Sequence, residues 1–393
     1  MSDIPEPVEL TAELIRFNTI NPPGQEENCA RFVGGLLKPA GFSVTYHELS
    51  PGRMNLIASK GNPASGNGSV ASRRKPICFT GHLDTVPLGS AQWSVDPLAG
   101  IVTDGKLYGR GSSDMKSGVA AMVVAALRNL KAIENGPGVV FVFTAGEETG
   151  CDGARCLAAK NLLGDAGAIV VGEPTSNQPR IGHKGVLWLN AETHGVTAHG
   201  SMPELGVNAV YRGARIISKL EEFGFNIAPH HGLGSPTLNV GRMAGGLNVN
   251  SVPDRAEIGI DVRSVPGMQH PRIVEILCSH LAPDLAELHT LLDLEPVWTA
   301  PESPWIRAAS KFAMSGKATS AELGGAPYFT DASILKSAYG DVPTLILGPG
   351  EQEMAHRTDE YCWAVNIEKA VGIYGDIIRD WQLHAHTYEE AAA

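Results

Sequence analysis

Residues 76–87 have the sequence PICFTGHLDTVP, in which a short apolar run is followed at once by His82 and Asp84. A run of this length and composition predicts a buried strand of a parallel sheet. The strand would then end on two polar side chains, before Pro87 turns the chain away. An HxD pair by itself is expected by accident in a chain with 13 histidines, so its meaning depends on the rest of the sequence.

The same order, an apolar run followed by a side chain able to bind metal, recurs along the chain. The further runs are VVFVFTA (139–145), AIVV (168–171) and PTLIL (343–347). The polar residues that follow them are Glu147 and Glu148, then Glu173, and slightly later His356. Amphipathic segments predict helices at 114–132, between the runs, and at 365–384, near the C-terminus. Alternating strands and helices predict an α/β fold, with a mostly parallel central sheet flanked by helices.

The middle of the chain has a different pattern. Between about residues 184 and 294, strand-like segments (185–195, 236–246 and 254–264) are mixed with helical ones (208–223 and 270–281). A chain of 393 residues also exceeds the size at which one hydrophobic core usually divides. We therefore expect a smaller α+β domain over residues 183–295, inserted into a larger domain formed by 1–182 and 296–393.

Composition excludes several classes of function. The net charge of −11 and the absence of a long basic run argue against nucleic-acid binding. No apolar stretch approaches the ~18–20 residues of a membrane span. The first residues, MSDIPEPVEL, lack a basic and an apolar segment, so we expect no signal peptide. Six cysteines without a CxxC pair predict reduced thiols and a cytoplasmic protein.

Polar side chains at the carboxyl ends of parallel strands meet at one edge of the sheet, where sites of α/β proteins lie. A mixture of histidine and carboxylate ligands suits zinc, and also cobalt or manganese. An aspartate can bridge two such ions ~3.5–4 Å apart. The pattern predicts two divalent metal ions, most simply zinc, and one ligand set of His82, Asp114, Glu148, Glu173 and His356.

Two polar residues are then left for other roles. Asp84 could accept the second ring N–H of His82 and so orient the imidazole. Glu147 could take a proton from a metal-activated water and pass it to a leaving nitrogen. Each residue taken singly has an ordinary explanation, such as a helix N-cap for Asp114, so the prediction rests on the joint pattern.

Several segments, in order along the chain, resemble one known family. They are GHLDTVP, GRGSSDMKSG, TAGEETG, VGEPT, HKG, AHGSMPELGVNA, DVRSVPGM and GPGEQEMAHRTDEY, between about residues 55 and 363. They resemble the M20 metallopeptidases, and within them the acetylornithine deacetylase and succinyl-diaminopimelate desuccinylase group. The resemblance implies a dinuclear zinc or cobalt hydrolase, with a catalytic domain and an inserted ferredoxin-like lid or dimerisation domain.

The resemblance also implies roles for the metal-site residues. His82 matches a first-metal histidine, and Asp84 matches the aspartate behind it. Asp114 matches the bridging ligand, and Glu147 matches the general base. The remaining matches are Glu173 as a first-metal ligand, with Glu148 and His356 as second-metal ligands.

Further matches concern the substrate. His199, in TAHGSMP, resembles a histidine that a partner subunit supplies to the developing oxyanion, and Gly200 stands where relatives often carry serine. Arg263 resembles a contact to a substrate carboxylate, for which its forked guanidinium is suited. Asn250 and Thr330 resemble substrate-side residues. The resemblance therefore also implies a homodimer formed through the inserted domain.

We expect hydrolysis of an amide in an N-acyl amino acid, as in an acetylornithine deacetylase. A succinyl-diaminopimelate desuccinylase, or a dipeptidase or carboxypeptidase of the same family, is an alternative. A catalytically silent metal-binding scaffold is an alternative of another class, but such a protein would be free to lose Glu147. A nucleotide-dependent enzyme has little support, because no GxxxxGK[ST] motif is present.

Overall fold

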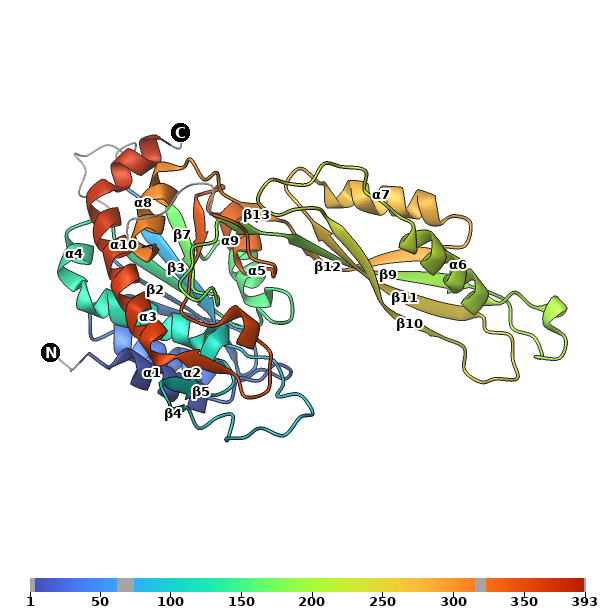
Figure 1. Ribbon diagram of the computed structural model, residues 1–393, viewed down its shortest axis with the longest axis horizontal. Coiled ribbons are helices and arrows are strands. Elements are labelled where there is room, and N and C mark those ends of the chain that lie inside the picture. Colours follow the sequence, from blue (N-terminus) through green and yellow to red (C-terminus); the bar gives the residue numbers. More distant parts are fainter. Residues whose placement is uncertain (1–3, 62–73, 315–322, 392–393) are drawn as a thin grey trace. The chain divides into compact units, whose positions relative to one another are not determined.

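The computed structural model describes residues 4–61, 74–314 and 323–391. The chain divides into two compact units. The first contains the residues up to Gly182 together with Trp298–Ala326 and the residues from Thr330 onward. The second contains His183–Val297 and Pro327–Phe329. Both units are drawn in Figure 1, coloured along the sequence.

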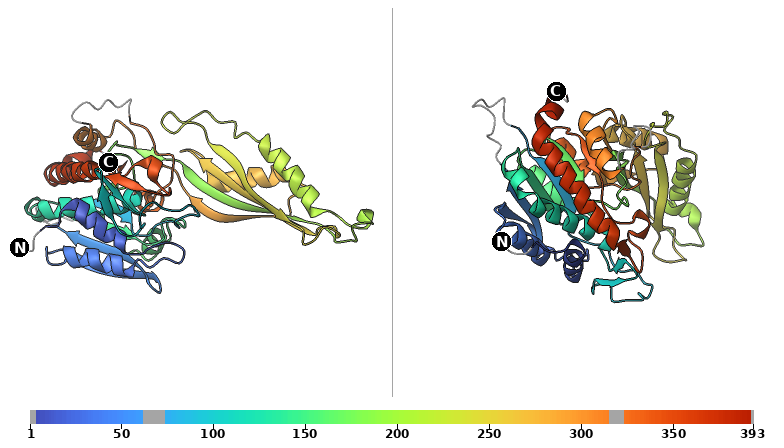
Figure 2. Two further views of the ribbon diagram at one scale, coloured as in Figure 1. Left: turned by 60° about the horizontal axis from the view of Figure 1, so that its bottom comes forward. Right: turned by 60° about the vertical axis from the view of Figure 1, so that its left-hand side comes forward.

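The first unit is built on a six-stranded sheet with the order β1-β2-β6-β3-β7-β14 (Figures 1 and 2). Its strands are β1 (Ser43–Ser50), β2 (Arg53–Lys60), β3 (Ile77–His82), β6 (Val139–Thr144), β7 (Ala168–Val171) and β14 (Thr344–Ile346). The four strands from β6 to β14 are parallel, whereas β2 is antiparallel to both β6 and β1. The predicted mostly parallel sheet is confirmed, and its four parallel strands are the four apolar runs of the sequence.

Strands β1 and β2 were not anticipated from the sequence. Strand β1, SVTYHELS, lies at the edge of the sheet and is exposed or half-exposed along its whole length. Because only the neighbouring β2 needs to bury side chains deeply, β1 can carry polar residues and shows no apolar run. A search for buried runs therefore misses β1. Strand β2 is buried from Met54 to Ala58, but Asn55 interrupts its apolar run and the strand was overlooked.

Helices cover both faces of the sheet. They are α1 (Pro7–Arg16), α2 (Glu27–Leu37), α3 (Ser117–Arg128), α4 (Leu130–Glu134), α5 (Asp152–Ala159), α8 (Pro304–Ala313), α9 (Ala332–Ala338) and α10 (Ala364–Glu390). On one face, the ring of Phe79 meets that of Tyr374 from α10 edge-on, with 5.7 Å between centroids. The next side chain back along the strand, Cys78, interacts with Tyr339 at the end of α9. Successive strand residues point to opposite faces, so α9 and α10 lie on opposite sides.

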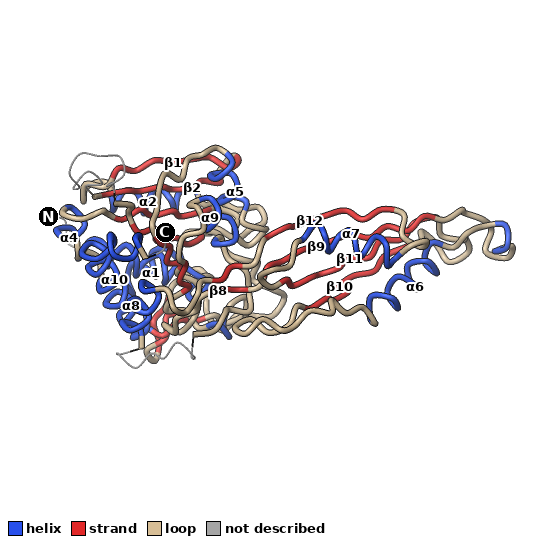
Figure 3. Tube along the Cα trace, turned by 90° about the horizontal axis from the view of Figure 1, so that it is seen from above, coloured by secondary structure: helices blue, strands red, loops and turns tan. Residues whose placement is uncertain are grey.

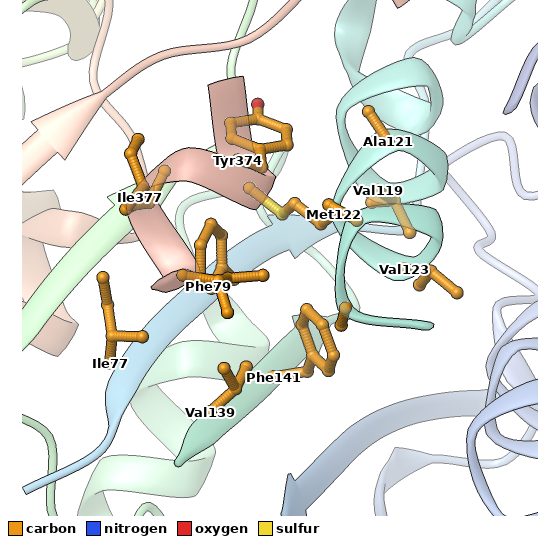
Figure 4. Packing of buried hydrophobic residues seen from close by; sticks show 14 of the residues in the cluster. Ile77, Phe79, Val119, Ala121, Met122, Val123, Val139, Phe141, Tyr374 and Ile377 are labelled. Atoms are coloured by element: carbon orange, nitrogen blue, oxygen red, sulfur yellow. The ribbon is translucent and has the colours of Figure 1, made fainter. Parts of the chain in front are cut away.

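The core of the first unit lies between this sheet and helices α3 and α10. Figure 4 shows Phe79, Phe141 and Tyr374 gathered there with Met122 of α3. Every residue of α3 from Ser117 to Leu127 is buried. A helix that is apolar on all sides in this way must be enclosed by other elements, and α1 and α10 both contact α3.

Smaller elements complete the first unit. Strands β15 (Tyr361–Trp363), β5 (Lys106–Tyr108) and β4 (Ile101–Thr103) form a separate antiparallel sheet. Strand β8 (Gly182–His183) pairs with β13 (Val297–Trp298), and the division between the two units falls within both strands. Among the residues that the structure describes, no helix is long and apolar enough to cross a membrane.

The second unit is a four-stranded antiparallel sheet with two helices. In chain order its elements are β9 (Gly185–His194), a short 3₁₀ turn (Pro203–Leu205), α6 (Ala209–Glu221), β10 (Thr237–Gly245), β11 (Arg255–Ser264), α7 (His270–Leu281) and β12 (Glu287–Leu294). The strand order is β10-β11-β9-β12, which with this βαββαβ sequence is the ferredoxin-like arrangement.

The alternation of buried and exposed residues along a central strand explains how the second unit is held together. Along β11, buried residues (Ala256, Ile258, Ile260 and Val262) alternate with more exposed ones, and they pack with apolar residues of α6 and α7. Both helices therefore cover the same face of this sheet, which Figure 3 shows from above. Strand β12 was missed from sequence because it is an edge strand with mostly exposed residues.

One fold prediction concerns Gly118, in the first turn of α3. A Cβ added there would lie 2.2 Å from the main-chain oxygen of Gly172, which directly follows β7. We expect Gly118→Ala to lower the free energy of unfolding by about 1–3 kcal/mol, because α3 must move away from the sheet. Thermal or urea denaturation would measure the change.

Gly372, within α10, provides the matched control, because a Cβ there meets nothing within 4 Å. Gly372→Ala should be neutral or should stabilise the protein by up to about 1 kcal/mol, since alanine has the higher helix propensity. Equal effects of the two substitutions would contradict the close approach of α3 to the segment after β7.

Candidate metal centre

The polar residues singled out in the sequence lie at one edge of the large sheet. His82 is the last residue of β3, while Glu147 and Glu148 follow β6 and Glu173 follows β7. These three strands are adjacent and parallel, so their carboxyl ends deliver the side chains to the same place. His356 arrives on the segment that follows β14, beyond a 3₁₀ turn at Gln352–Met354.

The carboxylate of Asp114 lies between two histidines. Its Oδ1 is 3.0 Å from Nε2 of His82, and its Oδ2 is 3.4 Å from Nε2 of His356. Asp114 belongs to an irregular turn, with φ −118° and ψ 94°, and its peptide bond to Met115 is cis. The predicted helix start at Asp114 is therefore wrong: regular α-helix begins at Ser117, and the turn before it presents the carboxylate.

Glu148 and His356 form one side of the cluster. Oε2 of Glu148 is 3.1 Å from Nε2 of His356. The other oxygen, Oε1, is buried and has no hydrogen-bond partner among the described residues. His356 itself has a positive φ of 64° and a side chain that is 55% exposed, which leaves this side of the cluster open to solvent.

Glu173 and Glu147 form the other, more deeply buried side. Oε1 of Glu173 is 3.8 Å from Nε2 of His82, and both glutamates are about as buried as core residues, at 4% and 5% exposure. Within this cluster, two groups of three residues have their possible ligand atoms within 4.8 Å of one another. They are His82, Asp114 and Glu148, and His82, Glu147 and Glu173.

The pKa values show how strongly these groups interact. Burial raises the pKa of Glu147, Glu148 and Glu173, and neighbouring carboxylates raise it further. Burial alone would lower the pKa of His82, but contacts with Asp114 and Glu173 outweigh it and raise the value well above normal. Hydrogen bonds to Asp114 and Glu148 raise the pKa of His356 to about 10.

The net pKa shift of Asp114 is opposite to that of the three glutamates. Its pKa would be raised by burial, yet the hydrogen bonds with His356 and His82 bring it below the ordinary value. Buried carboxylates packed against one another are costly unless a positive charge compensates them. The oxygen and nitrogen donors, the unpartnered Glu148 Oε1 and the mutual repulsion together fit divalent cations.

Asp84 makes a different contact from the one predicted. Nδ1 of His82 bonds to the main-chain oxygen of Asp84 at 2.9 Å, while the carboxylate Oδ1 is 3.7 Å away. The carboxylate instead accepts the main-chain N–H groups of Glu147 at 3.1 Å and Glu148 at 3.3 Å. Asp84 therefore orients the histidine through its backbone and holds the turn after β6 through its side chain.

Two further polar residues lie next to this site: sequence reasoning missed Asn21, and it noted Asp331 only together with Thr330. The buried Asn21 donates its side-chain amide to Oδ2 of Asp84 at 2.9 Å. The buried Asp331 accepts the hydroxyl of Thr144, at the end of β6, and burial raises its pKa to about 6. For Asn21 the available signal was the pair of prolines that follows it, in TINPPG, since an Asn-Pro dipeptide marks a turn.

The predicted substrate residue Thr330 is in the interior. Its side chain is fully buried, and its hydroxyl accepts the main-chain N–H of Ala332 at the start of α9. This bond fixes the turn that leads into α9, and a role of Thr330 toward a substrate stays a prediction.

The other predicted substrate residues belong to the second unit. His199 is exposed, and its Nδ1 accepts the main-chain N–H of Ser201 at 3.1 Å and contacts the Ser201 hydroxyl at 2.7 Å. Asn250 is exposed in the turn before β11. Arg263 pairs with Asp261 on the same strand, at 3.0 Å. Their roles toward a substrate stay predictions.

The sequence of this chain matches a protein family over most of its length. The model of peptidase family M20/M25/M40 matches residues 78–380. Acetylornithine deacetylase of Proteus mirabilis is 31% identical, over 97% of this chain and 98% of that protein. A probable succinyl-diaminopimelate desuccinylase of Staphylococcus epidermidis is 28% identical, over 95% of this chain and 96% of that protein.

Solved structures share the fold. An M20 family metallo-carboxypeptidase from Sulfolobus solfataricus superposes with a TM-score of 0.79 at 18% identity. The match covers 96% of this chain and 100% of that one. The mostly parallel sheet flanked by helices, with a further antiparallel sheet, is therefore an arrangement found in solved M20 proteins.

Replacement of a proposed ligand tests the metal centre. Saturation with Zn²⁺ should stabilise the protein, by about 2.7 kcal/mol at a concentration of 100 Kd for one site. In Glu173→Gln, the stability of the metal-free protein should be unchanged or higher, because a repelling buried carboxylate is removed. The increase in the free energy of unfolding that Zn²⁺ produces should fall by about 1.4 kcal/mol for each tenfold loss of zinc affinity.

Thermal unfolding with and without chelator measures both quantities. Asp104→Asn is the control, since Asp104 is exposed on the turn between β4 and β5 and asparagine tolerates its φ of 50°. If Zn²⁺ stabilised Glu173→Gln as much as it stabilises the wild type, Glu173 would be excluded as a ligand.

Proposed function

This chain belongs to peptidase family M20/M25/M40 and is a metal-dependent hydrolase of amide bonds, and we propose that it removes the acyl group from an N-acyl amino acid. The observation that carries the proposal is the position of Glu147, a buried carboxylate grouped with His82 and Glu173. The same cluster contains Asp114, Glu148 and His356. A carboxylate in the position of Glu147 is suited to move a proton next to a metal-activated water.

We assign the ligands as His82 and Glu173 for one ion, His356 and Glu148 for the other, and Asp114 as the bridge. The two oxygens of Asp114, each directed at a different histidine, support the bridging role. Zn²⁺ is the ion that this mixture of nitrogen and oxygen donors suits best, with Co²⁺ or Mn²⁺ as alternatives.

Divalent ions at these residues would polarise the amide carbonyl and acidify the attacking water. Glu147 takes one proton of that water on its carboxylate, and a bond forms between the water oxygen and the amide carbon. The carbon–nitrogen bond then breaks, and Glu147 gives the proton to the departing nitrogen. Because burial raises the pKa of Glu147 well above normal, its carboxyl can hold the proton between the two transfers. The products are a carboxylate and a free amine.

His199 is proposed as a hydrogen-bond donor to the developing oxyanion, supplied by the partner subunit of a homodimer. Its Nδ1 accepts the N–H of Ser201, so in the neutral imidazole the proton lies on Nε2. That nitrogen is then fixed as the donor. Arg263 and Asn250 remain candidates for binding the rest of the substrate, and a cytoplasmic location remains a prediction from the cysteine content.

The N-acetyl substrate is supported by the identity to an acetylornithine deacetylase over nearly the whole chain. A desuccinylase or a dipeptidase is the alternative, and initial rates on a substrate panel distinguish the three. N-acetylornithine should be hydrolysed with a kcat/KM at least tenfold above that of N-succinyl-diaminopimelate, simple dipeptides and other N-acyl amino acids. A preference for the succinylated compound, or for peptides, would overturn the acetyl assignment but leave the amidohydrolase in place.

The role of Glu147 has its own test. Glu147→Gln should lower kcat by at least about 10²–10⁴-fold, because the amide cannot accept the proton. Zinc content, measured by atomic absorption, should stay near that of the wild type.

Glu148→Gln is the comparison variant, and it should lose metal affinity as well as activity because Glu148 is a proposed ligand. Full turnover in Glu147→Gln would contradict the assignment of Glu147 as the general base. Loss of metal in that variant would identify Glu147 as a ligand instead.

A further inference from the structure

Glu360 is a buried carboxylate for which the chemistry above has no role. Its side chain is completely buried, and it accepts four hydrogen bonds. Oε1 accepts the main-chain N–H groups of Ser113 at 2.8 Å and Asp114 at 3.0 Å. Oε2 accepts the main-chain N–H of Gly111 at 3.0 Å and Nη1 of Arg110 at 2.6 Å. One side chain thus organises the whole turn that presents the bridging carboxylate.

Arg110 extends this connection to two other segments of the site. It is 2% exposed and donates from Nη2 to the main-chain oxygen of Pro87, at 3.0 Å. Pro87 ends the segment that begins with His82. Nη1 also lies 3.3 Å from the main-chain oxygen of Arg357, the neighbour of His356. The ion pair therefore contacts the segments that carry His82, Asp114 and His356.

The hydroxyl of Ser113 adds a further link between two of these segments. It donates to the main-chain oxygen of Tyr361 at 2.7 Å and accepts the N–H of Glu351 at 2.8 Å. A Cβ on Gly350 would lie 2.1 Å from the main-chain oxygen of Ser113. The turn before α3 and the segment 350–361 are thus in close main-chain contact on both sides of His356.

We propose that Arg110 and Glu360 are positioning residues, which set the separation between the Asp114 carboxylate and the His356 imidazole at which both can hold one metal ion. Glu360 binds the main-chain N–H of Asp114 and lies four residues after His356. A shift of this carboxylate therefore moves the backbone of both. This inference rests on the metal assignment of the proposed function, but not on the choice of substrate.

The arrangement of donors shows which substitution is informative. All four bonds to Glu360 come from N–H groups. In Glu360→Gln one carboxylate oxygen becomes an NH₂ group, which opposes two of these donors whichever way the amide turns. The variant also leaves Arg110 buried without its counter-ion, while the shape of the side chain is nearly unchanged.

Calorimetric titration of the chelator-treated protein with Zn²⁺ is the experiment. The wild type should bind two ions. In Glu360→Gln, the affinity for one of the two should fall about 10–100-fold, the effect expected for residues that orient metal ligands, and the other should fall less. Excess Zn²⁺ should then refill the weakened site. Because no substrate enters the titration, failure of the acyl-substrate assignment would not affect its outcome.

Gln382→Ala is the matched structural control. Gln382 is buried and bonds through both side-chain atoms to the main chain of Gly138, just before β6 and at the opposite end of that strand from Glu147. This variant should lose thermal stability without loss of zinc affinity. If it weakened zinc binding as much as Glu360→Gln at an equal loss of Tm, the effect would be one of general stability and the proposal would fail.

Arg110→Gln tests the other half of the ion pair. It also provides the test of the proposal if Glu360→Gln does not fold. It removes the links to Pro87 and Arg357 but leaves Glu360 its three main-chain donors. We expect the same site to weaken, by a smaller factor than in Glu360→Gln. Wild-type affinity for both ions in either folded variant overturns the positioning role of the residue replaced.

Discussion

The electrostatic repulsion among the buried carboxylates at the end of the large sheet is the constraint on which the rest of the structure depends. Glu147 and Glu148 follow β6 and Glu173 follows β7, and these two strands run parallel to β3 on either side of it. Burial and proximity raise the pKa of all three, so the folded chain without a cation holds them at a cost. Packing elsewhere must offset that cost, and the fully buried α3 and the aromatic core beside it supply such packing.

The turn before α3 shows how this constraint shapes the local backbone. If a regular helix began at Asp114, the carboxylate would cap it and would not be free to bridge two histidines. The chain instead delays the helix to Ser117 and uses the preceding residues as an irregular turn. Such a turn leaves its main-chain N–H groups without helical partners, and the buried carboxylate of Glu360 accepts them. The metal centre thus includes main-chain geometry as well as ligands.

The accuracy of the sequence-based interpretation depended on burial. Runs such as VVFVFT were recognised because strands buried on both faces are continuously apolar. Strands β1 and β12 were missed because edge strands with exposed residues carry no such run. Thr330 shows a different difficulty: the resemblance matches it to a substrate-side residue, whereas its side chain is buried and accepts the main-chain N–H of Ala332. A motif gives a position in the chain and does not specify the direction of a side chain.

By itself, the sequence determined the class of the fold, the parallel strands and the residue types at their carboxyl ends, because strand burial and turn chemistry are local and leave a pattern along the chain. The tertiary structure alone decided which atoms meet. It directed the two oxygens of Asp114 to different histidines, and it turned the carboxylate of Asp84 to the backbone after β6. It also placed Glu360 against the turn that contains Asp114, which lies 246 residues earlier in the sequence. Contacts over such separations depend on the packing of whole elements, and no local pattern encodes them.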